Sequence, residues 1–144
     1  MAMMDTYLRE CLFFTSSRLQ RIVTKIVDEE FARCGLPANG AFLLLAVLEE
    51  EGINQKKLGE TLHLQPSTVT RLIEKLVLKG VITSRVEGRS SLIYSTDKGK
   101  ALEPIIHDCW DRLRVFVNEV LGEEESNALT LRLDRVSEQL EKAD

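Results

Sequence analysis

The sequence predicts a mainly α-helical fold with one small β-hairpin, and three observations support this prediction. Over most of the 144 residues, apolar side chains recur every three or four positions, which is the period of a helix with one buried face. Glycine and proline stand where such helices should end and begin. Two runs rich in β-branched residues, 81–86 and 91–96, flank the polar stretch 87–90, a pattern typical of a hairpin with a four-residue tip.

Four of the predicted helices form the two ends of the chain and its core. The first runs from Tyr7 to about Cys34 and is followed by Gly35 as a stop. The second has Pro37 in its first turn and continues to about Glu50; it is apolar on nearly every side, so we expect it in the core. Two long helices, 99–121 and 123–142, carry broad apolar stripes, and we expect Trp110 and Phe116 to be core residues.

Two short helices lie between these parts and predict a helix-turn-helix. Asn54 is a suitable N-cap for a helix over 55–62, and a turn at 63–65 leads to a helix over 66–79. Pro66 suits the first turn of that helix, and Gly80 suits its end. His63 takes a turn position for which histidine is among the tolerated non-glycine residues, so we assign it a structural role.

Positive charge gathers in this middle segment although the chain as a whole is acidic. Residues 54–98 contain eight basic and four acidic side chains, whereas the net charge of the whole chain is −4. The distribution of charge matters more than its total for a nucleic-acid partner. A basic middle with acidic flanks is therefore compatible with DNA binding through residues 54–98 alone.

The predicted helix over 66–79 has one apolar face and one face suited to DNA. Its opposite face and first turn present short hydroxyls, an amide and cations, as a recognition helix does in the major groove. The alternative interpretation is that the hydroxyls only cap and solvate an ordinary helix. The candidate DNA-contacting residues here are Gln65, Pro66, Ser67, Thr68, Thr70, Arg71 and Lys75.

The hairpin that follows favours the DNA-binding interpretation. A β-ribbon directly after a helix-turn-helix is a wing, and this one carries Arg85 on its first strand and Arg89 at its tip. Such cations track phosphates or enter a minor groove. For Arg89 the alternative is a local ion pair with Glu87. Arg85 and Arg89 complete the candidate DNA-contacting set.

These residues resemble the MarR (multiple antibiotic resistance) family of winged helix-turn-helix regulators. The run from Lys57 to Leu76 is similar to the family's helix-turn-helix, and 80–99 to its wing and wing exit. Arg89, Thr96 and Gly99 match at the family's offsets. Glu87 stands where the family commonly has aspartate, and Ser95 where it commonly has leucine. The order and lengths of the helices resemble the family along essentially the whole chain.

The resemblance implies a homodimeric DNA-binding regulator, usually a repressor, that reads a pseudo-palindromic double-stranded operator. It implies that residues 1–34 and 100–144 form the dimer and that residues 35–99 form the DNA-binding lobe. The apolar stripes at both ends of the chain independently call for a partner surface. The family often binds a small phenolic or anionic effector between the dimer helices and the lobe, but the sequence selects no effector and no pocket.

Two alternatives to a ligand-responsive regulator stay open. Cys11 lies in the run Cys11–Arg18, which loosely resembles that of family members that sense hydroperoxides through a cysteine; a buried structural cysteine is the other interpretation. The second alternative is a winged-helix protein that binds other proteins instead of DNA. The cations on the predicted recognition face argue against it.

Other classes of function have little support in the sequence. The three cysteines and two histidines form no metal-binding spacing, and we find no nucleophile–base pair, carboxylate dyad or phosphate-binding glycine loop. We therefore expect no enzyme, no metal and no cofactor. We also expect a cytoplasmic protein without membrane contact, because there is no signal peptide and the longest apolar run, 41–48, is too short for a membrane span.

Overall fold

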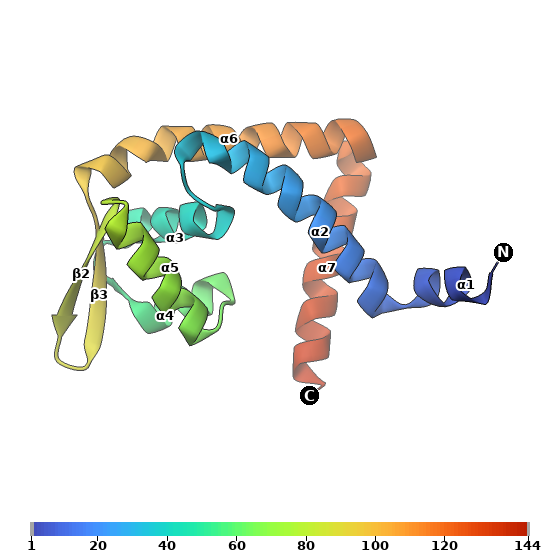
Figure 1. The fold of residues 1–144 in the computed structure, drawn as a ribbon, viewed down its shortest axis with the longest axis horizontal. Coiled ribbons are helices and arrows are strands. Elements are labelled where there is room, and N and C mark those ends of the chain that lie inside the picture. Colours follow the sequence, from blue (N-terminus) through green and yellow to red (C-terminus); the bar gives the residue numbers. More distant parts are fainter. Residues whose placement is uncertain (1, 144) are drawn as a thin grey trace. The chain divides into compact units, whose positions relative to one another are not determined.

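The structure is a computed structural model that describes residues 2–143, and it is mainly helical (Figure 1). Helices lead into a small sheet at the centre of the sequence, and two long helices follow it. In chain order the elements are α1 (Met3–Glu10), α2 (Leu12–Phe31), the 3₁₀ helix η1 (Ala32–Cys34), α3 (Ala38–Glu49), β1 (Ile53–Asn54), α4 (Gln55–Leu62), α5 (Pro66–Leu78), β2 (Ile82–Glu87), β3 (Ser90–Ser95), α6 (Asp97–Leu121) and α7 (Glu123–Lys142). The predicted mainly α-helical class with a small hairpin is confirmed.

The chain divides into two compact units, and the boundary falls inside α6. The first unit extends to His107 and the second begins at Asp108. The first unit holds the helix-turn-helix, the sheet and α3. Its core is apolar, and the largest fully buried side chains include Phe31, Leu43, Leu44, Leu58, Leu76, Ile82, Ile93 and Ile106.

The helix-turn-helix folds as its local sequence predicts. The side chain of Asn54 accepts a hydrogen bond from the backbone N–H of Lys57 at 2.8 Å, so Asn54 caps α4 as expected. His63 ends α4 with a φ of 54°, in the left-handed region. Pro66 begins α5, and Gly80 follows its C-cap with a φ of 76°.

The wing is part of a three-stranded antiparallel sheet with the order β1-β3-β2. Strand β1 was not predicted, because two residues are too few to give a periodic pattern. The predicted four-residue tip is wrong. Glu87 pairs with Ser90, which leaves a two-residue connection, Gly88–Arg89. Gly88 has a φ of 62°, and glycine at this position permits the tight turn.

The N-terminal helix also differs from its prediction. Instead of one helix over 7–34, the structure has α1 and α2 separated at Cys11, whose backbone is extended (φ −93°, ψ 115°). Neither glycine nor proline lies near this break, so the sequence carries no local signal for it. Pro37 is the N-cap of α3 rather than a residue of its first turn.

The start of α6 is fastened to the end of α5. The Thr96 hydroxyl donates to the Gly80 carbonyl at 2.6 Å and accepts from the backbone N–H of Gly99 at 3.1 Å. The Lys98 ammonium donates to the Lys79 carbonyl at 2.8 Å. A Cβ on Gly99 would collide with the carbonyl oxygen of Val81, so only glycine fits at this crossing.

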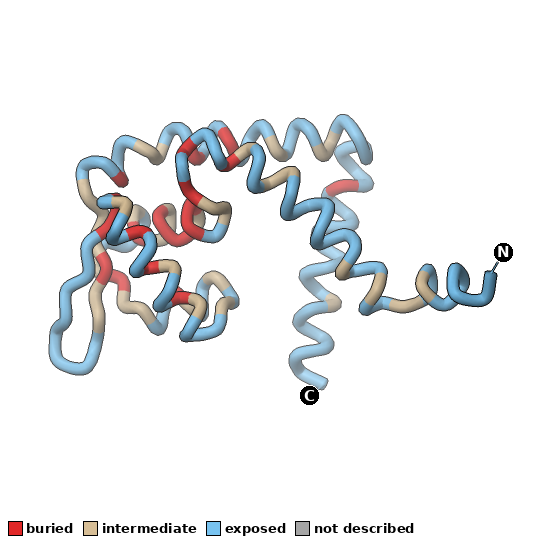
Figure 2. The backbone as a smooth tube through the Cα atoms, in the orientation of Figure 1, coloured by how far each residue is buried: buried red, intermediate tan, exposed pale blue. Residues whose placement is uncertain are grey.

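Most residues of the terminal helices are exposed (Figure 2), and large apolar side chains are among them. Within residues 108–143, the buried side chains are Cys109 and Ser126 alone. Trp110 and Phe116 are 45% and 44% exposed, so the expectation that they are core residues is wrong for the single chain. These helices have more apolar surface than one chain covers.

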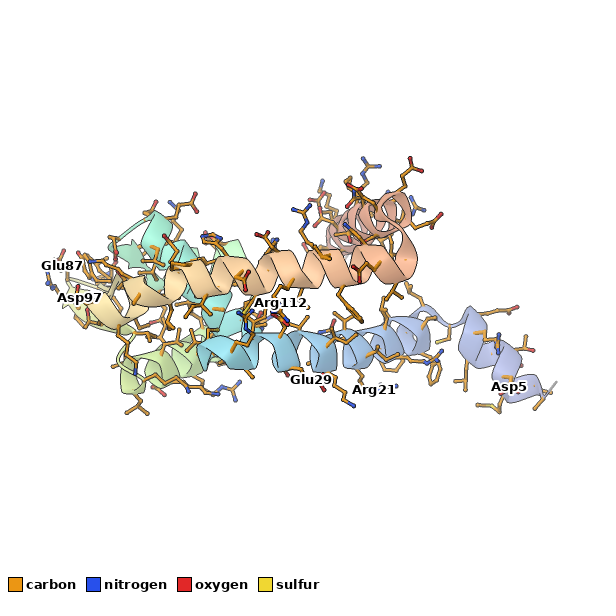
Figure 3. All side chains as sticks on the ribbon, turned by 90° about the horizontal axis from the view of Figure 1, so that it is seen from above. Asp5, Arg21, Glu29, Glu87, Asp97 and Arg112 are labelled. Atoms are coloured by element: carbon orange, nitrogen blue, oxygen red, sulfur yellow. The ribbon has the colours of Figure 1, made fainter. Side chains whose placement is uncertain are left out.

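In the first unit, α1 and α2 likewise expose apolar side chains, next to charged side chains that are also exposed. Leu12 and Ile22 are 61% and 48% exposed. Asp5, Arg21 and Glu29 project from the same two helices into solvent (Figure 3). The apolar spacing predicted for this region is real, but in one chain it is not buried.

No single helix within the described chain is long and apolar enough to cross a membrane. The segments Leu12–Cys34 and Ala38–Glu49 pass that test only together, and they are bent by 56° at their junction. Much of the second segment is buried in the core of the first unit.

Candidate nucleic-acid interface

Helix α5 is held by one face and leaves its other face open. Val69, Ile73 and Leu76 are buried, at positions that place them on one side of a helix. Ser67 and Arg71 are exposed on the opposite side, together with Glu74. The apolar anchor therefore fixes the direction in which the predicted recognition residues project.

One flank of α5 borders a hollow of about 690 Å³ between α4, the start of α5 and the wing. Pro66 and Arg89, both predicted DNA-contacting residues, line this hollow. Gln55 and Lys56 line it from the first turn of α4. The structure thus brings the first residue of the predicted recognition helix and the wing tip to one concave surface.

The other flank of α5 borders a groove of about 500 Å³ between α2, α3 and α5. Three predicted DNA-contacting residues, Thr68, Arg71 and Lys75, line it. Apolar side chains from all three helices form much of the remaining wall, namely Val23, Val27, Phe42 and Leu72. Arg71 therefore serves two surfaces, because it is exposed on the outer side of α5 and also borders this groove.

The hydroxyl of Thr70 makes two hydrogen bonds to other residues of the chain. It donates to the carbonyl oxygen of Pro66 at 3.0 Å and accepts from the Nε2 amide of Gln55 at 2.7 Å. Thr70 is among the candidate contacts predicted from the sequence, whereas Gln55 is not. Gln55 carries no local signal, since its contact is with a residue fifteen positions away.

The two wing arginines have different surroundings. The guanidinium of Arg85 lies 5.0 Å from the centre of the Tyr94 ring, a cation–π contact across the two strands. Arg89 is exposed at the tip, and among residues 2–143 no ion pair joins it to Glu87. Glu87, the last residue of β2, and Asp97, the first residue of α6, lie at the same end of the first unit (Figure 3). Arg89 is thus the wing cation that is open to a partner.

Other charges around the helix-turn-helix are structural. The ammonium of Lys57 lies 2.8 Å from a carboxylate oxygen of Glu50, and this hydrogen-bonded pair raises the pKa of Lys57 above its ordinary value of 10.5. The carboxylate of Glu51 accepts from the backbone N–H of Ser95 at 2.8 Å and from its hydroxyl at 2.5 Å. These contacts join the end of α3 to α4 and to the sheet.

Two remaining candidates line neither the hollow nor the groove. Gln65 is exposed at the N-cap of α5 and borders neither hollow. Cys11 is half-buried at the break between α1 and α2. Within the part of the chain that the structure describes, no group of three histidine, cysteine, aspartate or glutamate side chains is placed to hold a metal ion.

Comparison with known proteins gives a consistent result. Residues 38–86 match the profile described as the MarR family. The HTH-type transcriptional regulator SarZ of Staphylococcus epidermidis is 36% identical over 100 residues, which cover 67% of this chain. The match spans 66% of the length of SarZ, just under two thirds.

Two solved structures share the fold. The transcriptional repressor CouR, bound to p-coumaroyl-CoA, is 23% identical with a TM-score of 0.82; the alignment covers 91% of this chain and 94% of CouR. MepR of S. aureus, in complex with DNA, is 18% identical with a TM-score of 0.78; the alignment covers 90% of this chain and 98% of MepR. At these identities the likeness concerns the fold.

Proposed function

The chain belongs to the MarR family, and from this premise we propose that it is a sequence-specific, double-stranded-DNA-binding transcriptional regulator. In this proposal α5 enters the major groove, and Ser67 and Arg71 project toward base edges from its outer face. The wing tip follows the backbone through Arg89. Gln65, Pro66, Thr68, Lys75 and Arg85 support the same surface.

One observation carries this proposal. The first residue of α5 and the wing-tip cation Arg89 line one hollow, so a duplex that accepts α5 also meets the wing. The surplus of positive charge in residues 54–98 supports the same assignment. A protein-interaction surface would present apolar or acidic side chains here, whereas Arg71, Lys75 and Arg89 are cationic and exposed.

The test is binding to duplexes from upstream of the chain's own gene and neighbouring genes over a salt series. We expect a specific site and a steep negative slope of log affinity against log salt. Arg71→Ala should lower specific affinity by roughly 5- to 100-fold. Arg89→Ala should weaken binding and reduce the slope by about one unit, because one phosphate contact is lost.

Arg132→Ala on α7 serves as the control, since this arginine is exposed and lies outside the proposed interface. It should leave both affinity and slope unchanged. If Arg71→Ala and Arg89→Ala bind as well as the wild type, the assigned roles are wrong. If the wild type shows no preference among duplexes, the proposed function itself is wrong.

The regulator acts as a homodimer in this proposal. The exposed apolar positions on α1, α2, α6 and α7 supply the surface that a second copy would bury. The predicted division into a dimer-forming part, residues 1–34 and 100–144, and a DNA-binding lobe, residues 35–99, belongs to the same proposal. Two lobes would then read two half-sites of a pseudo-palindromic operator.

The groove between α2, α3 and α5 is the proposed effector site. Its apolar wall and the cations Arg71 and Lys75, against the single acid Asp28, suit a small anion with a phenolic or other apolar body. An effector bound there would share Arg71 with DNA. Binding should therefore release DNA, as expected of a ligand-responsive repressor, and the structure of CouR with p-coumaroyl-CoA is a precedent in the same fold.

This effector proposal is tested by DNA release. p-Coumaroyl-CoA should lower affinity for the specific duplex, whereas coenzyme A, which has no phenolic body, should not. Phe42→Ala, a change on the part of the apolar wall that α3 supplies, should reduce release without changing DNA affinity. If a panel of phenolic carboxylates and thioesters binds without changing DNA affinity, the groove does not couple to DNA.

Three further expectations belong to this proposal. We expect no catalytic activity and no resident cofactor, and we expect the protein to work in the cytoplasm, where its DNA would be.

The redox alternative stays a prediction, with Cys11→Ser as its test. If Cys11 is a sensor, this variant should keep its DNA bound in peroxide while the wild type releases it.

A further inference from the structure

The hydrogen bond between Thr70 and Gln55 determines which of these two side chains can contact DNA. A threonine hydroxyl has one proton, and that of Thr70 is donated to the carbonyl oxygen of Pro66. Its oxygen also receives the Nε2 amide of Gln55 at 2.7 Å. Thr70 therefore has no proton left to donate to a base or a phosphate, although it lies on the exposed side of α5.

Gln55, unlike Thr70, still has hydrogen-bonding groups that can contact DNA. Because the Thr70 proton points to Pro66, the amide edge that faces Thr70 is the NH₂ group, which fixes the orientation of the carboxamide. One N–H and the whole of Oε1 remain available. The bond to Thr70 also holds a flexible side chain in place, which lowers the entropy lost when it binds a partner.

The position of Gln55 places these groups at the proposed DNA surface. Gln55 is the first residue of α4 and is half-buried, and it lines the same hollow as Pro66 and Arg89. Residues of helix α4, the start of α5 and the hairpin line this hollow. A carboxamide held here lines the same hollow as the start of the recognition helix and the wing-tip arginine.

We infer that Gln55 reads a base edge of the operator and that Thr70 is a positioning residue that holds it, an inference that rests on the proposed DNA-binding function. A free N–H beside a free carbonyl oxygen complements the major-groove edge of adenine, which offers the N7 acceptor and the N6 amino donor. A phosphate offers acceptors only and would leave Oε1 without a partner. The pairing therefore assigns Gln55 to an adenine in each half-site.

The experiment uses the full-length chain and a duplex that it selects itself. The wild type first selects its preferred site from a random-sequence duplex library. Affinities are then measured for the selected duplex and for every single-base-pair variant of it, for the wild type and for Gln55→Ala. We expect Gln55→Ala to lose roughly 5- to 100-fold in affinity for the selected duplex and to lose discrimination at one adenine per half-site. The salt slope should stay unchanged.

Thr70 variants separate positioning from direct contact. Thr70→Val keeps the shape but removes the hydroxyl, so discrimination should fall at the same base pair as in Gln55→Ala. The double variant should be no weaker than Gln55→Ala alone. Thr70→Ser restores the hydroxyl and should restore discrimination. Thr61→Val, at an exposed threonine on α4 outside the hollow, is the matched control and should leave the specificity profile unchanged.

The failures are distinguishable from one another. A uniform loss across all duplexes with a flatter salt slope would make Gln55 a phosphate contact and overturn the inference, while DNA binding would stand. Additive effects of the two substitutions at different base pairs would make Thr70 a base contact and also overturn it. If the wild type selects no site, the proposed function fails and the inference falls with it.

Discussion

The helix-turn-helix region and the C-terminal helices differ in how far their apolar side chains are buried. In the first region Leu44, Leu58, Leu76 and Ile93 are fully buried. In the second, Leu133 and Leu140 are 43% and 57% exposed, although both regions have a helical apolar pattern. Periodicity therefore predicts an apolar face in both regions, but within residues 2–143 only the first face is covered. In the proposed homodimer the second face would belong to the interface.

The largest effect should come from the buried core. Leu44→Ala removes a fully buried side chain from α3 and should lower the free energy of unfolding by about 2–5 kcal/mol. Denaturant titration at one fixed protein concentration measures it. Leu131→Ala, at a half-exposed site on α7, is the paired variant. Equal losses in the two variants would remove the contrast between the regions.

The second effect tests whether the exposed face is an interface. Leu133→Glu places a carboxylate on the apolar side of α7, where Leu133 is 43% exposed. Burying that charge against a second copy should weaken dimerisation by about 30-fold or more. Sedimentation at several concentrations should show monomers for this variant, and dimers for Leu133→Met. A variant that remains dimeric would place the interface elsewhere.

A smaller effect is expected where the lobe depends on a single hydrogen bond. Asn54→Ala removes the side-chain oxygen that accepts the N–H of Lys57 and should cost about 1 kcal/mol of stability. Asn54→Asp keeps an acceptor and should restore most of it. Thermal unfolding of the three proteins measures the difference. If the alanine and aspartate variants melt together, the cap does not stabilise α4.

The smallest effect is expected at the surface ion pair. The pKa of Lys57 is raised by Glu50, so the stability that the charge of Lys57 contributes is fully present at neutral pH and is lost as the pH rises through the pKa of Lys57 in the folded state. Both groups are exposed, and solvent screens them. Lys57→Met should therefore show a stability indistinguishable from the wild type between roughly pH 6 and 9. A constant loss of stability across that range would show that the pair contributes more than its exposure implies.

Local sequence signals predicted the helix-turn-helix well because the residues that begin and end its helices are typical of those positions. The bounds of α4, its Asn54 cap and the left-handed His63 all follow from residues within one helical turn. Strand β1 was missed because it depends on pairing with β3, about forty residues away in the chain. The tip was predicted too long because the polar residues Glu87 and Ser90 have the composition of a loop, although they pair as the last residues of the two strands.

The candidate site divides in the same way. The periodicity of the apolar residues in α5 identified which of its side chains point away from the core. Arg71 and Arg89 are exposed as predicted. The role of Gln55 was invisible, because it depends on a tertiary hydrogen bond to Thr70. The break at Cys11 was equally hidden, since no residue beside it disfavours a helix. What the sequence lacks is information about contacts between elements.

The bonds that join the end of α5 to the start of α6 have a mechanical consequence. The hydroxyl of Thr96 links the Gly80 carbonyl to Gly99, Lys98 holds the Lys79 carbonyl, and the missing side chain of Gly99 closes the crossing. These contacts hold the residues that connect the two helices, so we expect the first turn of α6 and the end of α5 to move together. A tilt of that turn should then be passed to the recognition helix.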